Sequence, residues 1–551
     1  MTTESRSFIY VKRFFIAIAA LFLIRLVFLQ VLVQGEYAAN AAEVRTIQYT
    51  TAPHRGTIYD RNGTVLAVSV DATTIYANPT EVTNVDYEAR QLSSVLGGET
   101  GDYADLLRTK DTPFVYVKRQ ADVEDADRVK ELGLDGIYFL EESRREYPNG
   151  SIGGNVIGAC DVDGNGICGL ELEYDELLRG TPGEYSAERG VSGTPIPGGV
   201  HVDVPAVDGQ DIIISIDITL QESLERALEK GLEKYDEPRH GSAVVMDAET
   251  GDIHAMASFP YLNPADLAES LIGSDNLTPV TQSFEPGSVF KAFSALAVLQ
   301  ERALSPDDEL FVPAELQADE YIITDAHDRE DETMTFSEIL DNSSNVGISL
   351  AVDKVGFAKL SKVLTSLKFS EPTGIDFPGE DSGSLTEVSQ WSTIGGYNIS
   401  FGQGVTATPL QVTRAYGALA NEGIMVEPHF LIAKPQSDEW LEYGSEQVLF
   451  DQDAIGTLKG MLRGVVTNGT GKEAFIGGYD VVGKTSTAEI AENGTYAENR
   501  YNMCFTGFIN NSSSKLVCSV AANDVTYDRN VAGIFRDIML EAIELYKIVP
   551  E

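Results

Sequence analysis

The sequence is poor in the residues that build disulfide scaffolds and metal sites. It has 4 cysteines and 6 histidines in 551 residues. Four cysteines are too few for a disulfide-stapled fold, and no Cys-x-x-Cys pair or His/Cys cluster has the spacing of metal ligands. The scattered histidines give no Ser/His pairing that the sequence supports. We therefore expect a site without a metal or another cofactor.

The four cysteines form two pairs whose redox state the sequence leaves open. Cys160 and Cys168 flank a Gly/Asp-rich loop, and Cys504 and Cys518 lie on either side of a predicted turn. Either pair could form a disulfide outside the cell, and buried free thiols are the alternative.

Basic residues are scarce in comparison with acidic ones. The 40 Lys and Arg residues stand against 85 Asp and Glu residues, which gives a formal net charge of −45 at pH 7. A protein that binds nucleic acid needs clustered Lys and Arg, so this charge argues against a nucleic-acid partner. The apolar share of 43% is sufficient for packed cores, and the length predicts two to four domains.

Only one long apolar stretch occurs, at residues 14–33, and Arg25 and Gln30 interrupt it. Its 20 residues are enough to span a bilayer as a helix. Its many Leu, Ile, Phe and Val residues, at roughly −0.3 to −0.6 kcal/mol each, outweigh an arginine at about +3 kcal/mol. Basic residues precede the stretch and acidic ones follow it, which predicts a cytoplasmic tail at residues 1–13 and an extracytoplasmic chain after the anchor. A cleaved signal peptide is the alternative, because residues 39–41 look like a cleavage site.

The rest of the chain predicts an α+β multidomain protein. Residues 36–208 alternate short β-prone runs with amphipathic helical patterns and contain no catalytic constellation. A second domain is expected over residues 209–551. It starts with a strand at residues 212–216 and an amphipathic helix at residues 220–235, and a hairpin at residues 241–258 follows. It continues mostly as helices to about residue 364 and ends with strands and a last helix at residues 531–546.

The first candidate motif is Ser-x-x-Lys at Ser288 and Lys291. It follows Pro286-Gly287 and opens an apolar run that predicts a buried helix, so both side chains lie on one face of the first turn. A hydroxyl beside a buried lysine can act as a nucleophile beside its base, because burial disfavours the charged amine. Alone the motif is weak, since Ser512–Lys515 has the same spacing in a polar turn.

The second motif is Ser-x-Asn at Ser343 and Asn345, directly before another apolar run. Ser343 offers a hydroxyl that could relay a proton. Asn345 offers an amide that could orient a substrate carbonyl or Lys291. Alone, this pattern is more typical of an ordinary helix N-cap.

The third motif is Lys484-Thr485-Ser486-Thr487 within a β-prone run. Strand alternation predicts Lys484 and Ser486 on one face and the two threonines on the other. Such a strand can pair with an extended peptide, and Lys484 and the threonines could hold a substrate carboxylate.

The three motifs in this order resemble the class B penicillin-binding proteins, which are monofunctional peptidoglycan D,D-transpeptidases of the septal or sporulation type. Further stretches support the resemblance along nearly the whole chain. They are residues 55–63, 147–148, 169–171, 246–247, 250–251, 373–376, 401–404, 408–411 and 469–471. The resemblance implies a transmembrane anchor at residues 14–33, a mixed α/β pedestal of the dimerisation type at residues 36–208, and a transpeptidase domain at residues 209–551. That last domain would have a central antiparallel sheet flanked by helices.

The resemblance also implies a role for each motif residue. Ser288 would attack a peptidoglycan stem peptide, with Lys291 as its base and Ser343 passing the proton to the departing D-Ala. Asn345 would position the stem. Lys484, Thr485 and Thr487 would bind the terminal carboxylate. The backbone N–H groups of Ser288 and Thr487 would form the oxyanion hole, and β-lactams would inhibit by acylating Ser288.

One residue departs from the family pattern, because Ser486 stands where the third motif usually has glycine. Its side chain is expected either to crowd the Ser288 helix or to make a small local hydrogen bond, with activity retained and β-lactam reaction rates altered.

The family also implies partners, namely a multispanning glycosyltransferase and other division proteins in the membrane. Arg25 and the pedestal near the membrane are candidate contacts, and for Arg25 the equal alternative is a side chain that snorkels to the membrane surface. Two other functions remain as alternatives, a catalytically weak scaffold of the cell-wall synthesis complex and a β-lactam-hydrolysing or -sensing enzyme.

Overall fold

The computed structural model describes residues 3–32, 46–189, 195–235, 239–268, 270, 273–437, 439–492, 495–526 and 530–550. The chain divides into two compact units by its contacts. The first unit consists of Met1–His54, Ala72–Ser143 and Gly180–Asp208, and the second of Arg55–Asp71, Arg144–Arg179 and Gly209–Glu551. The division thus differs from the single cut at residue 208 that the sequence predicts, because two early segments belong to the C-terminal unit.

The first unit begins with α1 (Thr3–Val27), which continues as a π-helical turn at Phe28–Leu32. Among the described residues, no helix combines the length and the apolar character needed to cross a membrane. An antiparallel sheet in the order β1-β8-β9 follows, with the bounds Thr46–Thr51, Gly183–Arg189 and Pro195–Val204.

The first unit also contains a small α/β core. Leu92 and Leu107 are fully buried there together with Ile75. The surrounding elements are β3 (Val65–Ala77), α3 (Val85–Leu96), α4 (Thr100–Arg108), β4 (Val115–Ala121), α5 (Val123–Glu131) and β5 (Ile137–Glu146). The alternating strand and amphipathic helix patterns of residues 36–208 are therefore confirmed in this unit.

The second unit is built on a five-stranded sheet in the order β12-β11-β23-β22-β21, in which every neighbouring pair is antiparallel. The strands are β11 (His240–Asp247), β12 (Ile253–Phe259), β21 (Asp480–Glu492), β22 (Thr495–Asn510) and β23 (Leu516–Val525). The predicted central antiparallel sheet is thus confirmed, and β21 is one of its edges.

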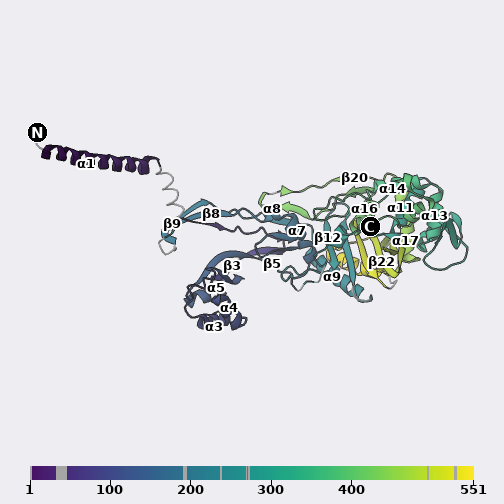
Figure 1. Ribbon diagram of the computed structural model, residues 1–551. Coiled ribbons are helices and arrows are strands. Elements are labelled where there is room, and N and C mark those ends of the chain that lie inside the picture. The colour runs from purple at the N-terminus through teal and green to yellow at the C-terminus, as the bar shows by residue number, and fades with distance from the viewer. Residues whose placement is uncertain are drawn as a thin grey trace. The chain divides into compact units, whose positions relative to one another are not determined.

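Helices cover both faces of this sheet (Figure 1). One face packs on α11 (Lys291–Gln300), α16 (Pro409–Ala420) and α17 (Gln452–Thr467). The other face packs on α9 (Ile218–Leu232) and α18 (Ala532–Tyr546). This layering buries every residue of α11 except Gln300, because the sheet lies on one side of the helix and other helices surround it.

The remaining elements of the second unit are short. The helices are α6 (Gly154–Ile157), α7 (Gly169–Glu173), α8 (Asp175–Leu178), α10 (Thr278–Thr281), α12 (Phe336–Asp341), α13 (Asn345–Asp353), α14 (Phe357–Ser366) and α15 (Thr393–Ser400). The strands are β2 (Ile58–Tyr59), β6 (Ala159–Cys160), β7 (Gly166–Cys168), β10 (Ile212–Ile214), β17 (Ile424–Val426), β18 (Leu431–Lys434), β19 (Glu439–Trp440) and β20 (Ser445–Gln447).

The region expected to be mostly helical contains two small antiparallel hairpins as well. Their strands are β13 (Glu309–Val312), β14 (Glu315–Ala318), β15 (Tyr321–Thr324) and β16 (Glu332–Thr335). These four-residue strands are too short to give a clear periodicity, and that is why the sequence pattern missed them.

All four cysteines are free, so neither possible disulfide is present. The register of the sheet explains the second pair: Cys504 lies opposite Ala521, and Cys518 lies opposite Gly507. The two thiols also belong to different hydrophobic clusters, one on each face of the sheet.

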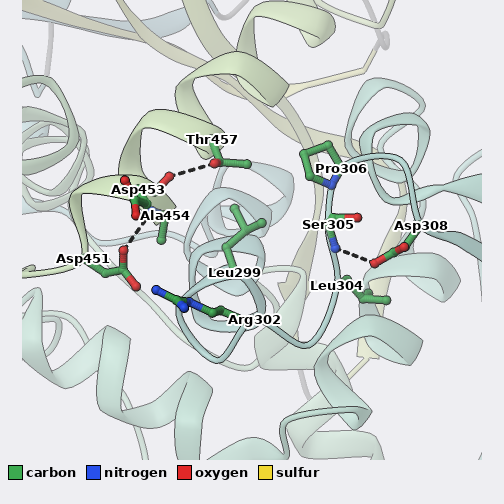
Figure 2. A pocket seen from close by; sticks show the side chains of 10 residues that line it. All are labelled: Leu299, Arg302, Leu304, Ser305, Pro306, Asp308, Asp451, Asp453, Ala454 and Thr457. Carbon is green, nitrogen blue, oxygen red and sulfur yellow. Dashed lines mark hydrogen bonds between the residues drawn. The ribbon is translucent and has the colours of Figure 1, made fainter.

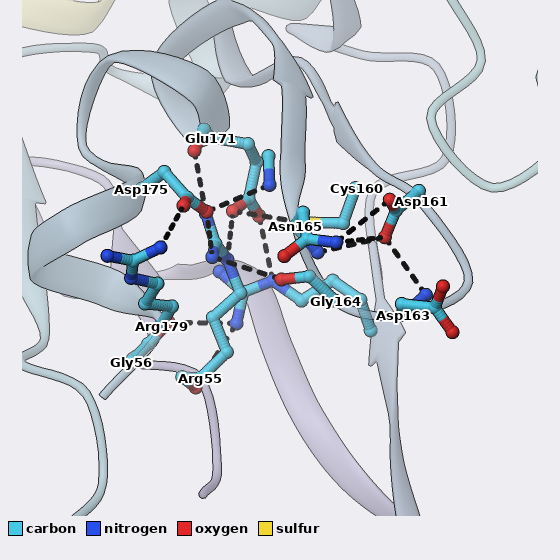
Figure 3. Close-up of polar contacts among 12 residues, drawn as sticks. Arg55, Gly56, Cys160, Asp161, Asp163, Gly164, Asn165, Glu171, Asp175 and Arg179 are labelled. Carbon is cyan, nitrogen blue, oxygen red and sulfur yellow. Dashed lines mark hydrogen bonds and ion pairs between the residues drawn. The ribbon is translucent and has the colours of Figure 1, made fainter. Parts of the chain in front are cut away.

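A cluster of charged residues lies within the second unit (Figure 3). The guanidinium group of Arg55 binds Glu171 and Asp175, each at 2.6 Å, and Arg145 binds the other oxygen of Glu171 at 2.7 Å. Glu171 is fully buried, and Arg55 is 6% exposed. Arg55 thereby joins segments of the chain that are more than a hundred residues apart.

Candidate active site

The Ser288 motif lies at the start of the buried helix, as predicted. Gly287–Phe290 forms one turn of 3-10 helix, and α11 continues directly from it. Residues three apart eclipse one another in a 3-10 turn, so Ser288 and Lys291 share one face. Lys291 has no exposed surface, whereas Ser288 is partly exposed. Within the described residues the Ser288 hydroxyl makes no hydrogen bond.

The second motif lies at the N-terminus of α13. Ser344 is the N-cap, and its side chain accepts a hydrogen bond from the backbone N–H of Gly347. Ser343 is therefore not needed as a cap. It has a φ of 58°, in the left-handed region that few residues other than glycine adopt. Such strained residues concentrate at functional sites, where the surrounding structure holds them.

The third motif lies on β21, the edge strand of the central sheet. Lys484 has no exposed surface and Ser486 is 1% exposed. Lys484 contacts Ser343 of the second motif, and Ser486 contacts Pro286, directly before the first motif. The hydroxyl groups of Thr485 and Thr470 form a hydrogen bond with each other, and Thr487 is exposed. The predicted alternation of the strand is thus confirmed.

The three motifs converge on the hydroxyl of Ser343. Lys291 Nζ donates to the main-chain oxygen of Ser343 and lies 3.2 Å from its Oγ. Lys484 Nζ lies 3.0 Å from the same Oγ. One hydroxyl therefore connects two buried amines that are distant in the sequence.

Burial lowers the basicity of both amines. The pKa of Lys291 is well below its ordinary value of 10.5, first because the side chain is buried and then because Lys484 is positively charged. Burial lowers the pKa of Lys484 to about 7, against the opposing effect of Asp341. Lys291 can therefore be neutral at a pH where a surface lysine is charged.

The predicted alternative in which Asn345 orients Lys291 is wrong. Asn345 Nδ2 donates to the main-chain oxygen of Thr324 at 3.0 Å instead. No described residue donates a hydrogen bond to its Oδ1, so the amide oxygen is available to a substrate.

The sequence did not reveal Asp325, which supports the second motif. Its carboxylate accepts hydrogen bonds from Ser344 Oγ at 2.8 Å and from the backbone N–H of Val346 at 3.0 Å, and it pairs with Arg329 at 2.6 Å. A carboxylate at a helix N-terminus is favourable, and here it fixes the start of α13. No sequence signal identifies it, because it lies 20 residues before Asn345 in a loop.

Asp341 was missed as well. It is 9% exposed, and its Oδ1 has no hydrogen-bond partner among the described residues. Burial raises the pKa of this carboxyl to about 6, Glu338 adds to the increase, and Lys484 opposes it.

Ser486 was expected either to crowd the Ser288 helix or to make a local hydrogen bond. Ser486 Oγ donates a hydrogen bond to the main-chain oxygen of Pro286 at 2.6 Å. The side chain thus makes a local hydrogen bond, two residues before Ser288.

A separate groove lies at the other end of α11 (Figure 2). It has a volume of about 270 Å³. It is lined by Leu299, Arg302, Leu304, Ser305, Pro306, Asp308, Asp451, Asp453, Ala454 and Thr457. None of the predicted site residues lines this groove, so it is distinct from the site around Ser343.

Two family models match the chain. The model described as "Penicillin binding protein transpeptidase domain" matches residues 241–540, which contain all three motifs. The model described as "Penicillin-binding Protein dimerisation domain" matches residues 50–214.

Individual relatives match over most of their length. "Stage V sporulation protein D" of Bacillus subtilis is 31% identical over 488 residues, which cover 86% of this chain and 74% of the relative. "Probable peptidoglycan D,D-transpeptidase PbpC" of Pseudomonas aeruginosa is 31% identical over 562 residues, which cover 100% of this chain and 97% of the relative. Penicillin binding protein 3 of Mycobacterium tuberculosis, solved as a complex with aztreonam, superposes with a TM-score of 0.71 at 25% identity. That superposition covers 91% of this chain and 98% of the other.

Proposed function

The chain belongs to the class B penicillin-binding proteins, and on that premise we propose that Ser288 is the nucleophile of its reaction. The protein is a peptidoglycan D,D-transpeptidase, a serine-type acyltransferase of cell-wall synthesis. The observation that carries the assignment of residues is the convergence of Lys291 and Lys484 on the Ser343 hydroxyl.

In the first half-reaction Ser288 Oγ attacks the carbonyl carbon of the penultimate D-Ala of a stem peptide. Lys291, held partly neutral by burial, accepts the hydroxyl proton. The bond from Ser288 Oγ to carbon forms and the peptide C–N bond breaks. Ser343 passes a proton to the amine of the departing D-Ala, because it lies within hydrogen-bonding distance of Lys291. The product is an acyl-enzyme and free D-Ala.

In the second half-reaction an amine of a neighbouring strand attacks the acyl-enzyme. The new C–N bond forms and the bond to Ser288 Oγ breaks. Lys291 takes a proton from the attacking amine and passes it to the serine oxygen. Two stem peptides are then cross-linked. A β-lactam follows only the first half-reaction and leaves Ser288 acylated.

The substrate is held against the edge of the sheet. β21 is an edge strand, so its outer backbone groups can pair with an extended stem peptide. Lys484, Thr485 and Thr487 bind the terminal carboxylate, and the amide oxygen of Asn345 accepts from the stem. The backbone N–H groups of Ser288 and Thr487 form the oxyanion hole; the loss of one such donor typically costs about 10²–10³ in rate.

We also propose the domain roles and the location of the protein. Residues 1–13 form a cytoplasmic tail, residues 14–33 a single-pass membrane anchor, residues 36–208 the pedestal, and residues 209–551 the extracytoplasmic transpeptidase domain. The support is the apolar stretch and its basic N-terminal flank, together with exposed side chains of α1 such as Phe22 and Leu23. The partners are a multispanning glycosyltransferase and other division proteins. The stretches of the pedestal that resemble the family favour a role in division.

Labelling with a fluorescent penicillin tests the nucleophile. Ser288→Ala is expected to abolish covalent labelling, while Ser512→Ala leaves it unchanged. Ser512 is the matched control, because it belongs to the other Ser-x-x-Lys spacing, in the turn before β23. Covalent label retained by folded Ser288→Ala refutes the assignment.

A further inference from the structure

Ser486 connects the third motif to the turn that carries the nucleophile. Its Oγ donates to the main-chain oxygen of Pro286 at 2.6 Å, and its side chain is 1% exposed. The two residues are 200 positions apart in the sequence. In the described part of the chain this is the only hydrogen bond between β21 and the residues from Pro286 to Ser288.

The turn beside Ser486 has no free space. A Cβ at Gly287 would lie 2.4 Å from Ser486 Oγ and 3.0 Å from the Cβ of Ala488, and Gly287 has a φ of 58°. On another side, a Cβ at Gly402 would lie 2.1 Å from the main-chain oxygen of Gly287. The backbone N–H of Gly287 donates to Gly402 at 2.9 Å. The turn is therefore held between β21 and the loop at Gly402.

Both donors of the proposed oxyanion hole adjoin this contact. Ser288 follows Gly287 in the turn, and Thr487 follows Ser486 in the strand. The two N–H groups belong to different segments, so their separation depends on how β21 is attached to the turn. Stabilisation of an oxyanion requires donors about 2.7–3.1 Å from the oxygen that develops in the transition state. A small change in separation therefore affects the transition state more than the bound ground state.

We propose that Ser486 is a positioning residue, whose hydrogen bond to Pro286 fixes the spacing of the Ser288 and Thr487 N–H groups for acylation. This inference rests on the proposed function. Ser486 touches no reacting atom in it and acts through the backbone on either side.

The test separates binding of a penicillin from the acylation step that follows it, by stopped-flow kinetics. Ser486→Ala is expected to lower the acylation rate constant about tenfold, a fraction of the loss caused by removing an oxyanion donor. The dissociation constant of the initial complex stays within about twofold, because the carboxylate contacts remain. Ser486→Cys keeps a weak donor and is expected to be intermediate.

Ser294→Ala is the matched control. Ser294 Oγ is also buried and also donates to a main-chain oxygen, that of Ser400, at 2.6 Å. It is expected to lower the melting temperature about as much as Ser486→Ala without changing the acylation rate constant. An aryl boronic acid, which forms a tetrahedral adduct on a serine, provides a second readout: its affinity falls in parallel with acylation only in the Ser486 variants.

The outcomes are distinct. If Ser486→Ala lowers only the melting temperature and acylates within twofold of the wild type, the inference is overturned while the proposed function stands. If Ser288→Ala is still labelled, the proposed function fails first. If Ser486→Ala does not fold, Ser486→Cys decides, and an unchanged acylation rate in that variant overturns the inference.

Discussion

Two clusters of buried cations in the C-terminal unit differ in how their charges are compensated. In the arginine cluster, Arg55 pairs with the buried carboxylate of Glu171 (Figure 3), and Arg145 pairs with the same carboxylate. In the lysine cluster, Lys291 and Lys484 share the hydroxyl of Ser343, and neither forms an ion pair with a described carboxylate. The first cluster binds carboxylates, and the second binds a neutral group that can carry a proton.

The two clusters therefore have opposite effects on pKa. Burial is the largest single effect on Arg55 and opposes its charge, but Glu171, Cys160 and Asp175 together outweigh burial and raise the pKa of the guanidinium. Burial lowers the pKa of both Lys291 and Lys484. A buried charge that is fully paired fixes structure, whereas a buried amine without a counter-ion is ready to exchange a proton. Arginine suits the paired cluster because it does not lose its proton in proteins. Lysine suits the other cluster because it loses its proton when it is buried.

The largest expected effect comes from breaking the lysine cluster. Lys291→Met should lower the rate of acylation by a penicillin by about 10³-fold or more, because the proposed nucleophile loses its proposed general base. The free energy of unfolding should fall by no more than about 1 kcal/mol, since an apolar side chain replaces an amine without an ion pair. Stopped-flow acylation and thermal denaturation measure the two quantities. Lys515→Met, in the second Ser-x-x-Lys, is the control and should leave acylation unchanged. Acylation within tenfold of the wild type contradicts the role of Lys291.

Breaking the arginine cluster should lower the free energy of unfolding and leave acylation unchanged. Glu171→Leu leaves Arg55 and Arg145 buried without their shared carboxylate, which should lower the free energy of unfolding by about 3–5 kcal/mol. Acylation per folded molecule should remain unchanged. Arg108→Ala is the control for a surface pair: Arg108 is 55% exposed beside Asp86, so its loss should cost less than about 1 kcal/mol. Denaturant unfolding gives both values, and equal losses in the two variants contradict the distinction.

The sequence predicted the members of the lysine cluster better than those of the arginine cluster. Ser288 and Lys291 lie within one helical turn, and the alternation of β21 places Lys484 and Ser486 on one face, so local periodicity was sufficient. Arg55 and Glu171 each belong to a recognisable stretch. The two residues are 116 positions apart, so their pairing depends on the fold of the chain between them, which no local pattern encodes.

Other features of the site depend on the three-dimensional backbone. The left-handed φ of Ser343 cannot be inferred from a residue type that rarely adopts it. The loop residue Asp325 supports α13 from outside the motif. The free state of Cys504 and Cys518 follows from the register of β22 and β23, and a shift by a single residue would have changed which faces they occupy.

The pH dependence of stability also distinguishes the clusters. The folded pKa of Lys484, about 7, lies below its ordinary value of 10.5. Between these two values the unfolded chain binds more protons than the native protein, so the free energy of unfolding should rise with pH in this window. Lys484→Met should reduce this rise and leave the part that the lowered pKa of Lys291 contributes, as measured by denaturant unfolding at a series of pH values. The arginine cluster should contribute no such slope, because its cations do not titrate there.

The smallest expected effect is on the pH profile of acylation, and it tests the two lysines separately. Lys291 must be neutral to act as a base, so the second-order rate constant should rise as Lys291 loses its proton. In the proposed function Lys484 must be charged to bind the carboxylate, so the rate constant should fall above about pH 7, by up to tenfold per pH unit. The arginine of the Lys484→Arg variant keeps its charge at higher pH. The alkaline limb of the profile should therefore shift to higher pH by more than one pH unit, even if the maximal rate is lower. A profile whose alkaline limb is identical in the wild type and in Lys484→Arg would assign that limb to another group. The lysine cluster would then contain only one amine that exchanges a proton during acylation.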